Sequence, residues 1–486
     1  MKVYDLIKAD EIISVNGKLD GDIGIFPTSN INNKEENALV FVLPRAMGEN
    51  KEVKIDAAYA VVCENNQRVI SGAPIIHVES ARAAFARATS RFEKIDYGSL
   101  TIIGVTGTNG KTTTATLLYE ILLAAGKPVG FIGTGKILIS GTDEGGEGYS
   151  MTTPDPECLY PVLARMQSRG VKYVVMEVSS HAIALGKVSP IPFKCCIFTN
   201  LSPEHMDFHS DMESYFEVKS RLFELSEMAV INLDDPYGRR LYSSFPRERL
   251  GVGIVHEGDA RASDIISIGL SGSSYIFRYG TLSFSVKLPL PGDFNIYNSA
   301  LALAAALSLG IKPCIARAAI CATPGIDGRM EIINGSVTAI IDYAHTPRAM
   351  ENALKTVKKA LKPKQRLFCV FGCGGERDRE KRSAMGNIAT ELSDFTFITE
   401  DNSRGEPFND ILSDIEKGID RRSSYTVIER REEAIFAAIT RADVGDAVLI
   451  IGKGHERYII DGAGRRPFDE RLIIKSALAV REGESK

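Results

Sequence analysis

Apolar runs alternate with helix-like segments along most of the chain, and this alternation predicts an α/β protein. The first runs, Leu39–Val42 and Ala60–Val62, are short, lie among polar turns and are followed by a helical stretch over 81–92. We therefore expect a small N-terminal α/β domain at residues 1–97.

From residue 98 the pattern becomes buried strand, glycine loop and helix. The apolar strand at 100–107 leads into the loop, and further strands are predicted at 173–180, 195–200 and 228–235 with helical segments between them. This order is typical of a mostly parallel sheet covered by helices on both faces. We place this central domain at residues 98–328.

A fresh set of strands begins after the turn GIDGR. These strands are predicted at 338–344, 366–372, 394–400 and 446–452, with helix-like segments such as 347–362 between them. The pattern predicts a C-terminal, Rossmann-like α/β domain at residues 329–486. The fold class is therefore α/β with three domains.

Composition excludes several classes of protein. The 486 residues are 44% hydrophobic and 25% charged, with a net charge of -4 and no dense basic face, so nucleic acid is not an expected partner. No apolar run of about 18 residues and no signal peptide is present, which predicts a cytoplasmic protein without membrane contact. The cysteines form no CxxC pair, so a structural zinc site is not expected. We expect a monomer.

The segment Gly104–Thr113 joins a buried strand to a helix start, where backbone N–H groups and the helix dipole can hold phosphate oxygens. Val105 stands where the general phosphate-loop motif has glycine, and the alternative is a glycine turn that only caps a helix. Lys111 would add positive charge, and the Thr112 hydroxyl would lie at a nucleotide-bound Mg²⁺. The predicted nucleotide contacts are Gly107, Thr108, Asn109, Gly110, Lys111, Thr112 and Thr113.

Two polar residues follow strands of the same predicted sheet. Glu177 ends one apolar strand, where a buried carboxylate is costly unless it is paired or bound to a metal, and His205 follows the next strand. The ends of parallel strands form the usual site crevice. We expect both residues near the γ-phosphate, with Thr112, as Mg²⁺ ligands.

The strings TGTNGKTT, MEVSSHA and TNLSPEHMDFH resemble signatures of the Mur ligase family. The resemblance implies an ATP- and Mg²⁺-dependent ligase that joins a carboxylate to an amino acid through an acyl phosphate. It implies that Lys219 becomes carbamylated and serves as a further metal ligand. The catalytic residues that it implies are Lys111, Glu177, His205 and Lys219.

The same resemblance assigns residues to the rest of the nucleotide. Asn295 would contact the adenine end of ATP, while Asn298 is expected to cap the helix that follows. Arg329 and Asp342 would contact the phosphates and the ribose. An arginine from a closing domain stabilises charge on a transferring phosphoryl group.

The strings FGCGGERDREKR, TEDNSRGEP and GKGHE resemble the UDP-N-acetylmuramoyl-tripeptide synthetase branch of the family, and the resemblance runs from about residue 100 to 475. It implies two substrates, a UDP-linked muramoyl dipeptide and an amino acid. Meso-diaminopimelate is favoured because Arg404 can form a bidentate pair with the distal carboxylate that lysine lacks. Ser403 replaces a proline of that motif, so lysine and ornithine remain alternatives. The implied amino-acid contacts are Arg377, Asp401, Asn402, Ser403, Arg404, Gly452 and Glu456.

The residues expected to bind the acceptor substrate, the UDP-linked muramoyl dipeptide, depart from the family pattern at several positions. Thr152, Thr153 and Ser179 match it, whereas Leu185 and Lys187 stand where glutamine and arginine are common, and the first domain lacks the usual Asp-Ser-Arg turn. Lys187 keeps the charge for the acceptor without the fork geometry. A Mur-like ligase with another acceptor, a folylpolyglutamate synthetase and a catalytically silent ATP-binding module are the remaining alternatives.

Overall fold

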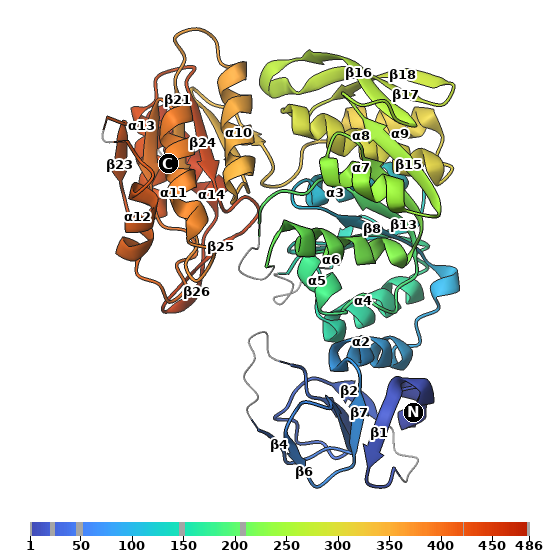
Figure 1. Cartoon of the computed structure of the whole chain (residues 1–486). Coiled ribbons are helices and arrows are strands. Elements are labelled where there is room, and N and C mark those ends of the chain that lie inside the picture. Colours follow the sequence, from blue (N-terminus) through green and yellow to red (C-terminus); the bar gives the residue numbers. More distant parts are fainter. Residues whose placement is uncertain are drawn as a thin grey trace.

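The computed structural model describes residues 2–19, 25–44, 52–144, 151–204, 210–420 and 422–483. Three main sheets follow one another along the chain, each with its own helices (Figure 1). The predicted α/β fold is confirmed. The central sheet starts at Thr101 and the third at Glu331, and we propose residues 97 and 328 as the ends of the first two domains.

The first sheet has the strand order β1-β7-β5-β3-β2 in the described part of the chain. Only β1 runs antiparallel to its neighbour. Helix α2 (Ala81–Phe92) covers the sheet, and the rings of Phe85 and Phe41 lie 5.1 Å apart. The strands are β1 (Ile12–Asn16), β2 (Phe26–Thr28), β3 (Ala38–Phe41), β5 (Ala60–Glu64) and β7 (Ile75–Val78), and β4 (Val53–Ile55) pairs with β6 (Val69–Ser71) beside them.

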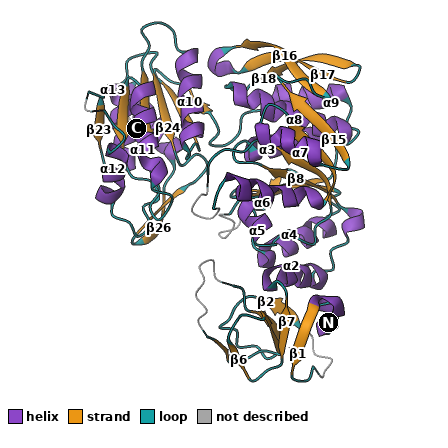
Figure 2. Ribbon diagram, viewed as in Figure 1, coloured by secondary structure: helices purple, strands orange, loops and turns teal. Residues whose placement is uncertain are grey.

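The central sheet is parallel in its middle, where β9, β12, β8, β13, β14 and β15 lie side by side. Helices cover both faces, as predicted (Figure 2). One apolar cluster joins the sheet to α3, α8 and α9, and another joins it to α4, α6 and α7. The strands are β8 (Thr101–Thr106), β9 (Val129–Gly133), β12 (Tyr173–Glu177), β13 (Phe193–Phe198), β14 (Ser226–Asn232) and β15 (Glu248–Gly253). The helices are α3 (Lys111–Ala124), α4 (Pro156–Ser168), α5 (Ser180–Ala184), α6 (Met212–Glu224), α7 (Pro236–Ser244), α8 (Asp293–Ser308) and α9 (Pro313–Ala322).

Both edges of this sheet carry strands that the apolar pattern did not predict. One edge is extended by β16 (Ala260–Ser267), β17 (Ser273–Tyr279) and β18 (Leu282–Leu288), of which β17 runs antiparallel to both neighbours. Much of β16 and β18 is exposed, so neither is a continuous apolar run. The other edge ends in β10 (Lys136–Ile139) and β11 (Thr142–Asp143).

The third sheet has the order β19-β20-β24-β21-β22-β23 among the described residues, and only β19 runs antiparallel. Asp342 and Phe371 both pair with Ile451, so the loops that follow these strands leave the same edge of the sheet. Its strands are β19 (Glu331–Ile333), β20 (Thr338–Asp342), β21 (Leu367–Phe371), β22 (Phe395–Ile398), β23 (Tyr425–Val427) and β24 (Ala447–Ile451), followed by the hairpin β25 (Tyr458–Asp461) and β26 (Gly464–Pro467). Its helices are α10 (Pro347–Ala360), α11 (Glu380–Leu392), α12 (Phe408–Glu416), α13 (Arg431–Arg441) and α14 (Glu470–Arg481).

Across the described ranges, none of the helices combines the length and the apolar character that crossing a membrane requires.

Candidate active site

The phosphate loop lies between the central strand β8 and helix α3, as predicted. Gly107 and Gly110 have φ angles of 147° and 85°. A Cβ atom on Gly107 would lie 1.9 Å from Thr199 Oγ1, and one on Gly110 would lie 2.3 Å from Asn298 Oδ1. Both positions therefore require glycine, because neighbouring side chains approach the loop backbone closely.

Part of the loop is held by the segment after β13. The Thr108 N–H donates to the Asn200 carbonyl at 2.8 Å, and the Asn109 N–H donates to Asn200 Oδ1 at 3.1 Å. The N–H groups at the start of α3, which include those of Thr112 and Thr113, have no partner within the helix. These N–H groups at the start of α3 are the ones best placed to donate hydrogen bonds to phosphate oxygens.

Two lysine side chains converge on the loop. Lys111 Nζ donates to the carbonyls of Gly107 and Thr108 at 3.0 and 2.7 Å, and Lys219 Nζ, from α6, donates to the same Gly107 carbonyl at 2.9 Å. Burial lowers the pKa of Lys111. Burial and the Lys111 charge lower the pKa of Lys219 well below its usual range. A lowered pKa enriches the uncharged amine, which is the form that can react with carbon dioxide.

The Glu177 carboxylate is fully buried beneath the loop. It accepts hydrogen bonds from Thr112 Oγ1 at 2.9 Å, from the Thr134 N–H at 3.0 Å and from Thr134 Oγ1 at 3.3 Å. A Cβ atom on Gly133 would lie 2.3 Å from Glu177 Oε1, so glycine makes room for the carboxylate. Thr134 had no sequence signal, because a threonine after a strand is common.

The donor set beside Glu177 fits Mg²⁺, which prefers oxygen ligands and keeps several waters or phosphate oxygens. Two hydroxyls, those of Thr112 and Thr134, contact the carboxylate, and Thr134 Oγ1 also lies 3.1 Å from Thr152 Oγ1. The described residues contain no group of three or more His, Cys, Asp or Glu side chains that could hold a metal. His205 lies outside the described residues, so its predicted role as a ligand remains a prediction.

Arg329 reaches the phosphate loop from the chain that leads into the third sheet. Its Nη2 donates to Thr112 Oγ1 at 3.0 Å, and its guanidinium lies 4.5 Å from the centre of the Tyr343 ring. Asp342 accepts from the N–H groups of Met330 and Ala344 at 2.8 and 2.9 Å. Burial raises the pKa of Asp342. The carboxylate thus shapes the turns on either side of Arg329, and its contact with a ribose remains a prediction.

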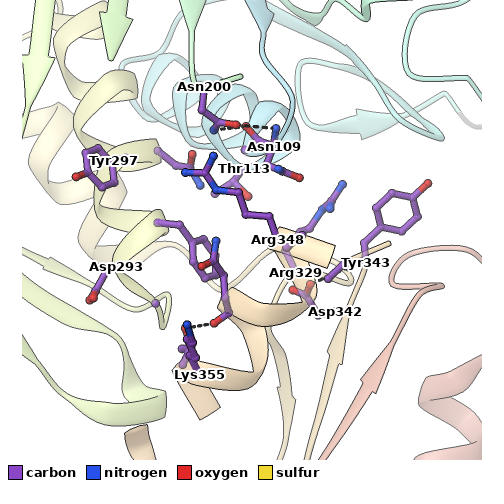
Figure 3. A pocket seen from close by; sticks show the side chains of 18 of the residues that line it. Asn109, Thr113, Asn200, Asp293, Tyr297, Arg329, Asp342, Tyr343, Arg348 and Lys355 are labelled. Carbon is purple, nitrogen blue, oxygen red and sulfur yellow. Dashed lines mark hydrogen bonds between the residues drawn. The ribbon is translucent and has the colours of Figure 1, made fainter. Parts of the chain in front are cut away.

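A cavity of about 470 Å³ opens between the phosphate loop, α8 and α10 (Figure 3). Asn298 lines it, whereas the predicted adenine contact Asn295 is 2% exposed and lies behind, accepting from Asn298 Nδ2 at 3.0 Å. Asn298 lies inside α8 rather than at its N-cap, so the prediction that it caps the helix is wrong. Asn295 orients Asn298, which itself faces the cavity.

The sequence reasoning missed several residues that line this cavity. Tyr297 donates its hydroxyl to Asp234 Oδ2 at 2.8 Å, and Arg348 and Lys355 project from α10 on the opposite wall (Figure 3). Arg348 and Lys355 are seven residues apart, so they share one face of the helix. That spacing was the signal available in the sequence.

The loops after β22 and β24 bring most of the predicted amino-acid contacts together. Asn402 Nδ2 donates to Glu456 Oε2 at 2.8 Å, and a Cβ atom on Gly452 would lie 2.5 Å from Asp401 Oδ2. Burial opposes ionisation of Asp401, but the Lys453 and Arg431 cations outweigh it and lower its pKa.

The two predicted arginines lie on neighbouring loops. Arg404 has a φ of 55°, and its Nη1 donates to the Gly375 carbonyl at 2.9 Å. A Cβ atom on Gly375 would lie 2.0 Å from the Ser403 carbonyl oxygen, so these two loops pack closely. Burial and the positive charge of the exposed Arg377 lower the pKa of Arg404. Two neighbouring guanidiniums suit a carboxylate ligand.

The predicted acceptor residues fall into two places. Thr153 Oγ1 donates to the Glu177 carbonyl at 3.0 Å and accepts from the Ser179 N–H at 3.0 Å, so both lie beside the carboxylate centre. Lys187 is buried and its Nζ lies 2.7 Å from Asp155 Oδ1. The Lys187 charge is therefore already paired within the central domain.

Comparisons with known proteins identify the family that the chain is similar to. The family model of the Mur ligase middle domain matches residues 105–306, and that of the Mur ligase glutamate ligase domain matches residues 328–454. A UDP-N-acetylmuramoyl-L-alanyl-D-glutamate–2,6-diaminopimelate ligase of Clostridioides difficile is 36% identical, with 99% of this chain and 100% of that protein covered. A ligase of the same name from Gloeobacter violaceus is 41% identical, with 87% of this chain and 86% of that protein covered. A solved structure of a ligase with that name has a TM-score of 0.60 at 30% identity and covers 88% of each chain.

Proposed function

The chain belongs to the Mur ligase family, and we propose from this that it adds meso-diaminopimelate to UDP-N-acetylmuramoyl-L-alanyl-D-glutamate at the expense of ATP. Such a reaction makes a precursor of peptidoglycan. The observation that carries the proposal is the convergence of Lys111, Glu177 and Arg329 on one phosphate loop.

The first step that we propose is transfer of the γ-phosphoryl group. A carboxylate oxygen of the acceptor attacks the γ-phosphorus, the bond to the β-phosphate oxygen breaks, and ADP leaves. Lys111 and Arg329 would offset repulsion between the two anions and hold them in line. Mg²⁺, held by Thr112, Glu177, His205 and carbamylated Lys219, would neutralise phosphate charge.

The second step forms the amide. The amine nitrogen attacks the acyl carbon, the bond between that carbon and the phosphate oxygen breaks, and the nitrogen loses a proton. The loops that carry Asp401, Arg404 and Glu456 would hold the amino acid. Arg404 and Arg377 offer two guanidiniums to the distal carboxylate of diaminopimelate, which lysine and ornithine lack.

Two supporting assignments belong to the same proposal. Lys219 would be carbamylated, as the resemblance to the family implies, and burial, which lowers its pKa, favours the uncharged amine that this reaction needs. Thr152, Thr153 and Ser179 would face the acceptor beside Glu177, and Asp155 would orient Lys187. We also propose that the enzyme acts as a monomer in the cytoplasm.

Phosphate release by the purified protein tests the proposal. ATP, Mg²⁺ and the UDP-linked dipeptide are supplied with meso-diaminopimelate, lysine or ornithine in separate reactions. We expect release that requires the acceptor and is fastest with diaminopimelate. Faster release with lysine or ornithine would reassign the amino acid. Absence of release with all three would point to another acceptor or to a silent ATP-binding module.

A further inference from the structure

Lys453 is a fully buried cation between the two loops to which the proposed function assigns the amino acid. Its side chain has 0% exposure, and it follows β24 directly after Gly452. The sequence reasoning gave Lys453 no role. A buried ammonium needs compensating partners, so its contacts indicate what it does.

The Lys453 ammonium contacts three oxygens from both loops. Nζ lies 3.0 Å from Asn402 Oδ1, 3.1 Å from Glu456 Oε2 and 3.6 Å from Asp401 Oδ1. An ammonium has three N–H donors and no acceptor. Asn402 Oδ1 and Glu456 Oε2 accept hydrogen bonds from it, and Asp401 lies at ion-pair distance. All three partners are residues that the proposed function assigns to the amino acid.

These contacts determine the orientation of the Asn402 amide. Its Oδ1 accepts from Lys453 Nζ and from the Ile460 N–H at 2.9 Å, while its Nδ2 donates to Glu456 Oε2. A flipped amide would place NH₂ against two donors and oxygen against a carboxylate. Lys453, together with the Ile460 N–H and the Glu456 carboxylate, therefore fixes which polar atom Asn402 presents on each side.

The Glu456 carboxylate is held in the same way. Its Oε2 receives both Lys453 Nζ and Asn402 Nδ2, whereas its Oε1 has no hydrogen-bond donor in the part of the chain that the structure describes. One oxygen is thus used to fix the carboxylate, and the other remains available to an ammonium group of a ligand.

A second buried cation nearby makes its hydrogen bonds outside the proposed amino-acid site, although its charge also acts on Asp401. Arg431 is also fully buried, and it donates to Glu470 Oε1 and to the Ile451 carbonyl, both at 2.7 Å. Neither of these partners belongs to the proposed amino-acid site. Lys453 differs because every oxygen that it contacts belongs to that site.

We propose that Lys453 is a positioning residue for the incoming amino acid, because its ammonium joins Asn402 and Glu456 across the two loops and fixes the polar atoms that they present. This inference rests on the proposed function. It predicts that loss of the Lys453 charge impairs use of the amino acid far more than use of ATP.

The test compares Lys453→Met and Lys453→Gln with the wild type in the full-length protein. Methionine keeps an unbranched side chain without charge, and glutamine supplies a neutral amide NH₂ group with two N–H donors. Arg366→Met is the matched control, since it removes an ion pair with Asp446 at the start of strand β21 and away from both loops. Thermal unfolding is measured for each variant, and phosphate release is measured with diaminopimelate and with ATP varied in turn.

We expect Lys453→Met to raise KM for the amino acid at least about tenfold, as for a severed buried charge pair, with KM for ATP changed less than about twofold. Lys453→Gln should lie between Lys453→Met and the wild type. Arg366→Met should lower the unfolding temperature and leave both KM values near those of the wild type.

Equal effects on KM for the amino acid and KM for ATP, or a loss of kcat alone, would show that Lys453 has only a structural role. Either result would overturn the inference. If Lys453→Met does not fold, the glutamine variant decides by the same ratio of KM values. If both fail to fold, Lys453 is required for folding and the inference is rejected. Absence of amino-acid-dependent release by the wild type would instead refute the proposed function.

Discussion

The guanidinium of Arg329 donates a 3.0 Å hydrogen bond to the hydroxyl of Thr112, although 217 residues separate them in the chain. Thr112 in turn donates to the buried Glu177 carboxylate at 2.9 Å. Arg329, from the segment that enters the third sheet, is thus linked through the Thr112 hydroxyl to the Glu177 carboxylate of the central sheet. In the proposed reaction, this relay lies beside the γ-phosphate.

Arg329→Ala should lower kcat about 10²- to 10³-fold, as loss of one preorganised donor to a developing charge does in other enzymes. The expected change in KM for ATP is smaller, because Lys111 and the loop remain. Phosphate release under saturating substrates measures the effect. A variant with normal kcat would show that Arg329 only joins the domains.

Glu177→Gln keeps the shape of the side chain and removes its charge. We expect the Mg²⁺ concentration for half-maximal activity to rise about tenfold or more, because divalent Mg²⁺ prefers charged oxygen ligands. A Mg²⁺ titration of phosphate release, with unfolding temperature as the check on folding, measures this. Thr134→Val is the companion variant, since it removes a hydroxyl from the same carboxylate without changing charge. An unchanged Mg²⁺ requirement in Glu177→Gln would exclude this carboxylate from the metal site.

Arg348 lies on the wall of the cavity opposite Asn109 and Thr113 (Figure 3). Arg348→Ala should raise KM for ATP about tenfold, the size of one lost charged hydrogen bond. Lys358→Ala is the matched control, because Lys358 is on the same helix but donates to the Leu392 carbonyl outside the cavity. Equal KM values in the two variants would contradict a nucleotide contact by Arg348.

Arg404→Lys keeps the positive charge and removes the planar guanidinium, whose paired N–H donors can bind both oxygens of a carboxylate. KM for meso-diaminopimelate should rise about 10-fold or more, since a hydrogen bond to a charged group contributes roughly 1.5–3 kcal/mol. Turnover of lysine, which has no distal carboxylate, should change little. The ratio of kcat/KM for the two amino acids is the measurement, and an unchanged ratio would place the distal carboxylate elsewhere.

Stability should fall below neutral pH because of His455. Burial, together with Arg329 and Arg471, lowers the pKa of His455 from 6.5 to about 3. Between these values the unfolded chain binds a proton that the folded chain does not, so stability decreases as pH falls, by about 1.4 kcal/mol per pH unit at most. Unfolding temperatures between pH 7 and pH 5 should therefore fall less steeply in His455→Gln than in the wild type. Parallel curves would assign the acid sensitivity to other groups.

The elements with strong local patterns were predictable from the sequence. The phosphate loop and the strands that end at Glu177 and Asp342 combine apolar runs with glycine or a polar residue at the end, and the backbone reproduces them. The half-exposed strands β16 and β18 were missed, because solvent on one side removes the apolar run that marks a buried strand.

The sequence by itself determined which residues stand at strand ends and loops, because backbone geometry follows local apolar spacing and glycine. Only the tertiary structure decided which of them meet. Thr134 beside Glu177 and Lys453 between Asn402 and Glu456 leave no local pattern, since packing of distant segments brings them together. Asn298 shows the same limit: it lines the cavity and is hydrogen-bonded to Asn295, whose contact with the nucleotide remains a prediction.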